Sequence, residues 1–319
     1  MPGEPIRYLD RTTRTLQTEE IYGEQWLRFA YETGLGRLGV WALVRRRAFS
    51  RWYGWRMSIG AKRDYDMPLV HLLRLIVGGG NSADRILPFI QKYGLDVDEF
   101  AKSPFDYRTF NEFFYRQLKP GARPIAAGEG VAVLPADGRH LVFPDVDTVP
   151  GFYVKGAKFT LAALLADEGL AQKFAGGAML ISRLCPVDYH RFHFPVAGAP
   201  GEPRLVNGWL YSVSPVALRR NIGYLVENKR VVTLVESPQF GTVAMLEIGA
   251  TNVGSIVNDF VPGRAVAKGA EKGLFAFGGS CTIVLFQRGR IAFDADLVSS
   301  SAEHIEVYAK MGDRLGVAP

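Results

Sequence analysis

Three short segments place side chains that can act as nucleophile, base or acid beside strand-like runs. The segment FAFGGSCTIVLF (275–286) has two potential nucleophiles, Ser280 and Cys281, between two glycines and an apolar run. CPVDYHRFHFPVAG (185–198) contains His190 and His193, whose imidazoles titrate near neutral pH and suit acid–base catalysis. LPADGRH (134–140) contains Asp137. A serine, a histidine and an aspartate can form a nucleophile, its base and an orienting carboxylate.

Each segment also has a purely structural explanation. Gly278 and Gly279 can form a β-bulge, and Asp-Gly is common in turns. Ser280 does not lie in a G-x-S-x-G elbow, because residue 282 is threonine, so the α/β-hydrolase motif is missing. Prolines bracket the two histidines, and no acidic or cysteine ligand has a suitable spacing from them. The sequence therefore predicts no metal site.

The apolar patterns divide the chain into a helical part and a mainly β part. Helical spacing occurs in EEIYGEQWLRFAYE (19–32), PLVHLLRLIV (68–77), DRILPFIQKYG (84–94) and FNEFFYRQLKPGARPI (110–125). Asn81 or Ser82 is a candidate N-cap for the third helix. Short runs rich in β-branched residues follow: GVAVLPADG (130–138), AMLISRLCPV (178–187), RVVTLVES (230–237), GTVAMLEIGATNVGSIV (241–257) and CTIVLF (281–286). We expect helices from 17 to about 118 and mainly strands from 126 to 319.

The composition is that of a globular protein of about two units. The chain has 319 residues, of which 48% are hydrophobic and 22% charged. Two cysteines are too few for a disulfide scaffold and favour a reducing compartment. The N-terminus has no apolar segment typical of a signal peptide, and no apolar run approaches the length of a membrane-spanning helix.

The net charge of +6 is concentrated in one stretch. Between Arg37 and Arg63 arginines and lysines alternate with tryptophans and other apolar residues, and there is no acidic residue. Such a stretch suits an anionic membrane surface, where aromatic rings lie at the level of the headgroups. A basic helix packed through its aromatic residues, or a nucleic-acid site, would have the same composition. We favour the membrane and expect no nucleic-acid partner.

Taken in order, several motifs resemble those of phosphatidylserine decarboxylases, pyruvoyl-dependent enzymes made as self-cleaving precursors. The resemblance runs from about Phe105 to Val307 and rests on these motifs: FNEFFYRQLKPGARPI, PADG, CPVDYHRFHFPVAG, GATNVGSI, KGAEKG and FGGSC. An ordered set of this kind is far more specific than any one motif. The first hundred residues match only in helical, basic character.

The resemblance implies self-cleavage between Gly279 and Ser280. Ser280 would attack the preceding carbonyl and become the pyruvoyl cofactor, with His193 as base and Asp137 as its orienting partner. The family's commonest site reads Leu-Gly-Ser-Thr, so Cys281 replaces a threonine here, and a thiol could also act as nucleophile. We favour Ser280.

The resemblance also assigns later steps. The pyruvoyl ketone would form a Schiff base with the amine of phosphatidylserine and withdraw electrons as carbon dioxide leaves. His190 would act at this decarboxylation stage, as proton donor to the carbanion. Lys268 and Lys272 are candidates for binding the substrate phosphate or carboxylate, and solvated lysines in a turn are the competing explanation.

We therefore predict an α+β fold with a helical, membrane-associating region at 1–125 and a mainly β catalytic domain at 126–319, completed by the C-terminal small chain. The predicted function is decarboxylation of phosphatidylserine to phosphatidylethanolamine, a step of phospholipid biosynthesis. The predicted partners are phosphatidylserine, an anionic membrane surface and the large and small chains of one precursor, at the cytoplasmic side of the cell membrane. A homodimer is left open. The alternatives are a pyruvoyl-dependent decarboxylase of a free aromatic amino acid and a lipid-binding module without activity.

Overall fold

The computed structural model describes residues 6–19, 82–153, 156–250, 255–276 and 280–319. Three predicted features lie outside these residues: the helical patterns between 20 and 77, the basic and aromatic stretch 37–63, and Gly279 of the predicted cleavage site. Within the described ranges no helix is both long and apolar enough to cross a membrane.

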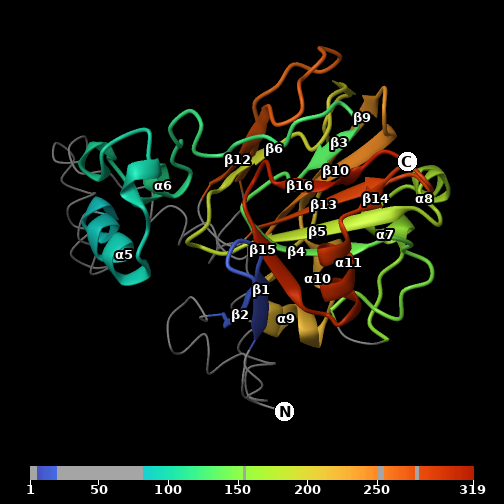
Figure 1. Ribbon diagram of the computed structural model, residues 1–319, viewed down its shortest axis with the longest axis horizontal. Coiled ribbons are helices and arrows are strands. Elements are labelled where there is room, and N and C mark those ends of the chain that lie inside the picture. The colour runs from blue at the N-terminus through green and yellow to red at the C-terminus, as the bar shows by residue number, and fades with distance from the viewer. Residues whose placement is uncertain (1–5, 20–81, 154–155, 251–254, 277–279) are drawn as a thin grey trace.

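A ten-stranded sheet forms the body of the protein (Figure 1). Its order is β2-β1-β15-β4-β5-β13-β10-β9-β7, and β8 also pairs with β9. All neighbours are antiparallel except β1 and β15, which are parallel. The strands are β1 (Arg7–Asp10), β2 (Thr15–Thr18), β4 (Gly138–Phe143), β5 (Ala178–Leu184), β7 (Ala199–Pro200), β8 (Arg204–Val206), β9 (Arg230–Ser237), β10 (Gly241–Gly249), β13 (Ser280–Phe286) and β15 (Glu306–Ala309).

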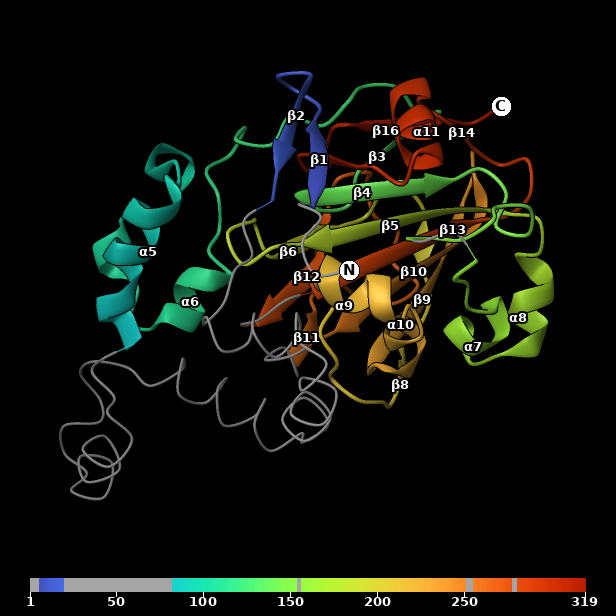
Figure 2. The ribbon, with the colours of Figure 1, turned by 90° about the horizontal axis from the view of Figure 1, so that it is seen from below.

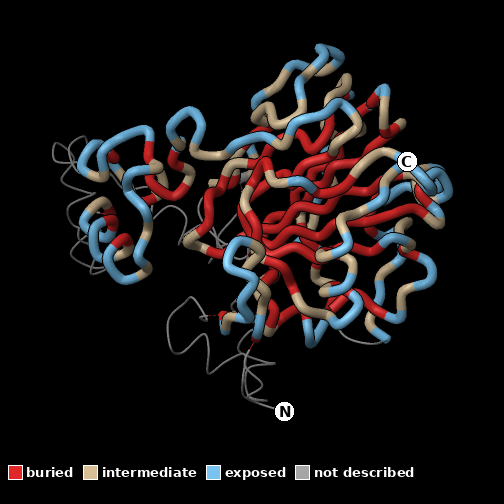
Figure 3. Tube along the Cα trace, in the orientation of Figure 1, coloured by how far each residue is buried: buried red, intermediate tan, exposed pale blue. Residues whose placement is uncertain are grey.

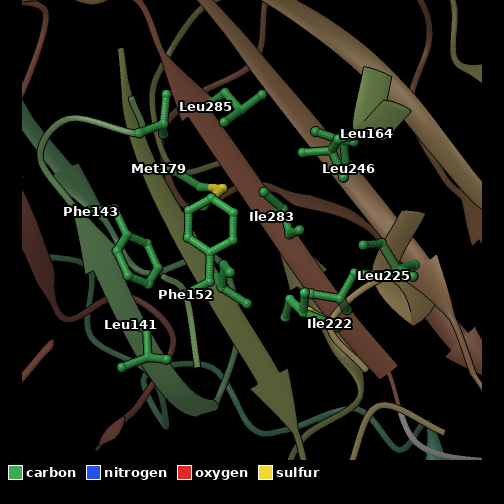
Figure 4. Packing of buried hydrophobic residues seen from close by; sticks show 14 of the residues in the cluster. Leu141, Phe143, Phe152, Leu164, Met179, Ile222, Leu225, Leu246, Ile283 and Leu285 are labelled. Carbon is green, nitrogen blue, oxygen red and sulfur yellow. The ribbon is translucent and has the colours of Figure 1, made fainter. Parts of the chain in front are cut away.

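Side chains from one face of this sheet meet a layer of short helices. The helices are α7 (Leu161–Leu165), α8 (Glu168–Lys173), α9 (Pro215–Arg220) and α10 (Tyr224–Glu227). Ile283 and Leu285 of β13 and Leu246 of β10 share one buried cluster with Leu164 and Leu225 of these helices (Figure 4). Each such side chain, when fully buried, contributes about 1.5–3 kcal/mol.

The opposite face packs against α11 (Ala295–Ala302) and a small sheet (Figure 2). The order of that sheet is β14-β16-β3, with bounds Ala292–Phe293, Arg314–Val317 and Val131–Val133. Val284 and Phe286 of β13 belong to the buried cluster on this face, together with Leu297 of α11 and Leu315 of β16. β13 is therefore buried on both faces, as Figure 3 shows for the central strands.

A third sheet leads directly to the predicted cleavage site. Its order is β11-β12-β6, with bounds Ser255–Asn258, Glu271–Ala276 and Arg191–His193. β12 ends at Ala276, four positions before Ser280, and β6 carries His193. The predicted strands between 126 and 319 are thus confirmed, and the histidine segment and the cleavage segment are neighbours through β6 and β12.

The helical part that is described lies beside the sheet as a small lobe (Figure 1). It contains two α-helices and three 3-10 turns around a cluster of aromatic residues: η1 (Ser82–Arg85), α5 (Ile86–Tyr93), η2 (Val97–Glu99), η3 (Pro104–Asp106) and α6 (Phe110–Phe114). Ser82 does not cap α5, because the 3-10 turn comes first and the Ser82 hydroxyl accepts the N–H of Phe110 at 3.3 Å. Gly94 ends α5 at φ +60°, as its position after the apolar pattern predicts.

The prediction of a helical region over 1–125 is wrong for residues 7–18. These residues form β1 and β2, and β1 pairs with β15, a strand near the other end of the chain. The segments RYLD and TLQT are too short and too polar to stand out as strands by their pattern. Their pairing with a distant strand decides their conformation.

Candidate functional site

Ser280 is the first residue of β13 and is completely buried. It lies opposite Leu184 of β5 on one side and Gly249 of β10 on the other. Its Oγ has no hydrogen-bond partner among the described residues. A buried hydroxyl that is not hydrogen-bonded costs free energy, and such a cost is typical of functional sites.

Cys281 points to the other side of the sheet. Along a strand alternate side chains face opposite ways, and Cys281 belongs to the buried cluster of Ile283 and Leu285. Ser280 lies on the face of Val284, which packs in the opposite cluster. Burial also raises the pKa of the Cys281 thiol, so the nucleophilic thiolate is disfavoured. The two candidate nucleophiles therefore lie in different environments.

His193 ends β6 with its imidazole largely buried. Its Nδ1 lies 3.1 Å from the carbonyl oxygen of Gly269. A carbonyl can only accept, so Nδ1 carries the proton and Nε2 keeps a lone pair. Nε2 has no hydrogen-bond partner in the described part of the chain. Burial lowers the pKa of His193, so the ring is neutral at pH 7 and suited to act as a base.

Asp137 lies in the loop before β4 and is buried. Its Oδ2 accepts from Nη2 of Arg123 at 2.6 Å, and Arg123 Nε lies 2.9 Å from Oδ1. The backbone N–H of Met311 donates to Oδ1 at 2.8 Å. The carboxylate is thus bonded to Arg123 and Met311, while the carbonyl of Gly269 holds His193. Burial lowers the pKa of His193, and three interactions oppose this effect: first the hydrogen bond to Gly269, then the charge of Glu271, and then the charge of Asp137.

A small apolar cluster brings together the segments that carry the candidate residues. Its buried members are Ala136, Leu184, Phe192 and Phe275. Ala136 precedes Asp137, and Phe192 precedes His193. Leu184 lies opposite Ser280 in the sheet. Phe275 donates its N–H to the carbonyl of His190 at 2.9 Å. Four segments that are far apart in the sequence therefore meet around one buried centre.

His190 precedes β6 and is completely buried. Its Nδ1 lies 2.9 Å from the backbone oxygen of Asp188. Its ring lies against Phe114 of α6, with ring centroids 3.9 Å apart. The His193 ring lies near Tyr189 instead, at 5.8 Å between centroids. The two histidines thus have different neighbours, and the helical lobe contributes a wall of the site beside His190.

The two candidate lysines differ in their surroundings. Lys268 donates to the backbone oxygen of Gly128 at 2.7 Å on the surface. Lys272 is neither a solvated lysine nor a surface ligand, because it is fully buried and its Nζ lies 2.8 Å from Oε2 of Glu247. Burial lowers the pKa of Lys272 and raises that of Glu247, and each partner offsets the other's shift. Glu247 and Arg123 were not singled out from the sequence, where charged residues are expected at the surface.

Comparisons with known proteins identify the family of this chain. A sequence model of the family described as phosphatidylserine decarboxylase matches residues 110–317. A phosphatidylserine decarboxylase proenzyme of Chlamydia muridarum is 45% identical over 317 residues, which cover 99% of this chain and 98% of the relative. The proenzyme of Chlamydia trachomatis is 43% identical over 316 residues, with 99% and 98% covered, and that of Fusobacterium nucleatum is 39% identical over 316 residues, with 99% of each covered. The chain belongs to the phosphatidylserine decarboxylase family.

Proposed function

We propose that this chain is a precursor that cuts itself between Gly279 and Ser280 and then converts phosphatidylserine to phosphatidylethanolamine. The observation that supports this most directly is the Ser280 hydroxyl, which is buried at the start of β13 without a hydrogen-bond partner among the described residues. The names of the relatives supply the substrate and the proenzyme form.

Self-cleavage needs a nucleophile and a base, and this chain offers both. Nε2 of His193 takes the proton of the Ser280 hydroxyl, and Oγ attacks the carbonyl carbon of Gly279. The peptide C–N bond breaks, an ester forms, and the proton passes to the released amine. Removal of the Cα hydrogen of Ser280 then breaks the ester C–O bond and releases Gly279 as a carboxylate. Water converts the remaining dehydroalanine to a ketone and ammonia, which leaves a pyruvoyl group on residue 280.

The surroundings of Ser280 fit such a group. Gly249, opposite Ser280, has no side chain beyond its hydrogen, and the neighbouring Leu184 is apolar. When present, a pyruvoyl group here would supply a ketone for the substrate amine and an acceptor for the electron pair left by carbon dioxide. His190, held by Asp188 and Phe114, then returns a proton to the substrate carbon.

The test is the intact mass of the purified protein. We expect two chains, 1–279 and 280–319, and we expect the small chain to resist Edman degradation because its N-terminus is a ketone. Ser280→Ala is the control and should remain one chain. Carbon dioxide release from phosphatidylserine is then compared with release from free aromatic amino acids. A wild-type protein that stays in one piece would refute the proposal, and release from the free amino acids alone would refute the lipid substrate.

We also propose that the chain binds anionic membranes through the stretch 37–63. The support is its composition, with eight basic and no acidic residues among aromatic ones. Replacing Arg45, Arg46 and Arg47 by Glu should release the protein from anionic vesicles without affecting self-cleavage. Unchanged vesicle binding by this variant would refute the membrane proposal.

A further inference from the structure

Arg123 is fixed by two carboxylates and almost completely buried. Its side chain is 7% exposed, and that of Asp137 is 2% exposed. Nε contacts both oxygens of Asp137, at 2.9 and 3.0 Å, and Nη2 contacts Oδ2 at 2.6 Å. Nη2 also lies 3.0 Å from Oε2 of Glu99, and Nη1 donates to the backbone oxygen of Ala122 at 2.7 Å. The planar guanidinium is therefore held in one orientation by all three of its nitrogens.

The contacts of Arg123, Asp137 and Glu99 link three parts of the precursor: the helical lobe, the β domain of the proposed large chain and the proposed small chain. Glu99 lies in the helical lobe, and Asp137 lies in the large chain of the proposed product. Met311, whose N–H donates to Asp137, and Lys310, whose Nζ lies 2.8 Å from Glu99, belong to the proposed small chain. The contacts around Asp137 and Glu99 thus come from both sides of the proposed cleavage site.

We infer that Arg123 is a positioning residue for self-cleavage, which keeps the carboxylate of Asp137 charged and fixed so that it supports His193 as the base. This inference rests on the proposed function, in which His193 deprotonates Ser280. A buried carboxylate without a counter-ion favours its protonated, neutral form. A neutral Asp137 no longer stabilises the imidazolium that forms when His193 takes the proton. Arg123 supplies a charge that cannot be lost, because guanidinium stays protonated.

Other charged and titratable groups also surround Asp137, and none of them replaces Arg123. Five groups interact with the carboxylate through space without a hydrogen bond to it: Arg116, His193, Asp188, Tyr189 and Tyr308. Among these five, Arg116 is the only permanent cation, and its Nη2 donates to the backbone oxygen of Val187 instead. Asp188 opposes the charge of Asp137. The direct counter-ion of Asp137 in the described structure is Arg123.

The Tyr189 ring lies near both Arg123 and His193. The guanidinium carbon of Arg123 lies 6.0 Å from the centre of that ring, and the ring centre lies 5.8 Å from the centre of the His193 imidazole. The guanidinium contacts the carboxylate of Asp137 directly, whereas the imidazole of His193 is not among its hydrogen-bond partners in the described residues. This geometry stabilises the negative charge of Asp137 more strongly than it opposes a positive charge on His193.

The experiment measures the rate of self-cleavage of freshly translated precursor between pH 5 and 9, by denaturing electrophoresis. The variants are Arg123→Gln, which removes the charge, and Arg123→Lys, which keeps the charge without the planar fork. For Arg123→Gln we expect the pH of half-maximal rate to rise by about 1–3 units, so that the rate falls more at pH 6 than at pH 9. Arg123→Lys should restore the pH of half-maximal rate and only part of the maximal rate.

The matched control is Arg11→Gln, which removes another paired arginine. Arg11 binds Asp296 through Nε at 2.8 Å and Asp294 through Nη2 at 2.9 Å, and it lies outside the candidate site. We expect its pH of half-maximal rate to equal that of the wild type. An arginine with a structural role only would lower the yield of folded precursor and leave this pH unchanged.

Each outcome decides one point. If Arg123→Gln folds and cleaves with the wild-type pH profile, or if its rate falls by the same factor at every pH, the inference is wrong. If Arg123→Gln does not fold, Arg123→Lys decides by its maximal rate per folded chain: a reduced rate supports the inference, and a wild-type rate overturns it, because the planar fork is then not needed to fix Asp137. Asp137→Asn in the same assay distinguishes failure of the proposed triad from failure of the inference about Arg123. Cleavage of Asp137→Asn at the wild-type rate would overturn the proposed triad. If Asp137→Asn does not cleave while Arg123→Gln cleaves normally, the inference alone is wrong.

Discussion

The buried ion pair of Lys272 and Glu247 offers a quantitative test of the structure. Lys272 is in β12 and Glu247 is in β10. The pair therefore connects the three-stranded sheet that carries His193 to the ten-stranded sheet, in which Ser280 is the first residue of β13. Both side chains are fully buried, and Oε1 of Glu247 has no hydrogen-bond partner within the described residues. Lys272→Met therefore leaves a buried carboxylate without its counter-ion, and we expect the free energy of unfolding to fall by about 3–5 kcal/mol. The double variant Lys272→Met/Glu247→Leu should recover most of this loss.

In the single variants Lys272→Met and Glu247→Leu, the free energy of unfolding should change with pH in opposite directions. In Lys272→Met, the lone carboxyl group of Glu247 binds its proton more tightly in the folded chain than in the unfolded chain, because burial raises its pKa. The free energy of unfolding then falls as pH rises, by about 1.4 kcal/mol per pH unit or about 2–3 kcal/mol from pH 6 to 8. In Glu247→Leu, burial lowers the pKa of Lys272, the unfolded chain binds more protons, and the free energy of unfolding rises over the same range.

Urea unfolding at pH 6, 7 and 8 measures both effects. All variants are compared in the Ser280→Ala background, so that every chain has the same covalent connections. The double variant should show neither of the two pH slopes. Losses below 1 kcal/mol in both single variants, or slopes of the same sign, would mean that this pair is not buried as the structure describes.

Three further predictions concern the catalytic residues. Ser280→Ala should remain one chain, and Cys281→Ser should cleave at close to the wild-type rate, because the thiol of Cys281 faces the opposite core. The reverse pattern on denaturing electrophoresis would make Cys281 the nucleophile. The rate of self-cleavage should rise with pH through the pKa of His193, which burial lowers from 6.5, and should be flat from pH 7 to 8; a rate still rising tenfold per unit there would exclude His193 as the base. His190→Ala should still cleave but release carbon dioxide about 10² to 10⁴ times more slowly per pyruvoyl-bearing chain; turnover near the wild-type value would remove His190 from the mechanism.

Much of the β domain could be predicted from the sequence because strand patterns are local. The run CTIVLF alternates between two apolar cores, and its β-branched residues favour an extended chain. The helix ending at Gly94 follows from its apolar spacing and from the glycine that ends it. The strands Arg7–Asp10 and Thr15–Thr18 could not be predicted in this way, because their conformation depends on pairing with β15 near the other end of the chain.

The sequence by itself determined the chemical identity of the candidate site, since the types and order of Asp137, His190, His193 and Ser280 are local motifs. Only the tertiary structure decided how these residues are supported. In the fold, His193 contacts the carbonyl of Gly269. Asp137 is bound by Arg123 and Met311. Ser280 and Cys281 lie on opposite faces of one strand. The physical reason is that a charge or a hydrogen bond takes its partner from whatever the fold brings within about 3 Å, and sequence spacing does not encode which distant segment that is.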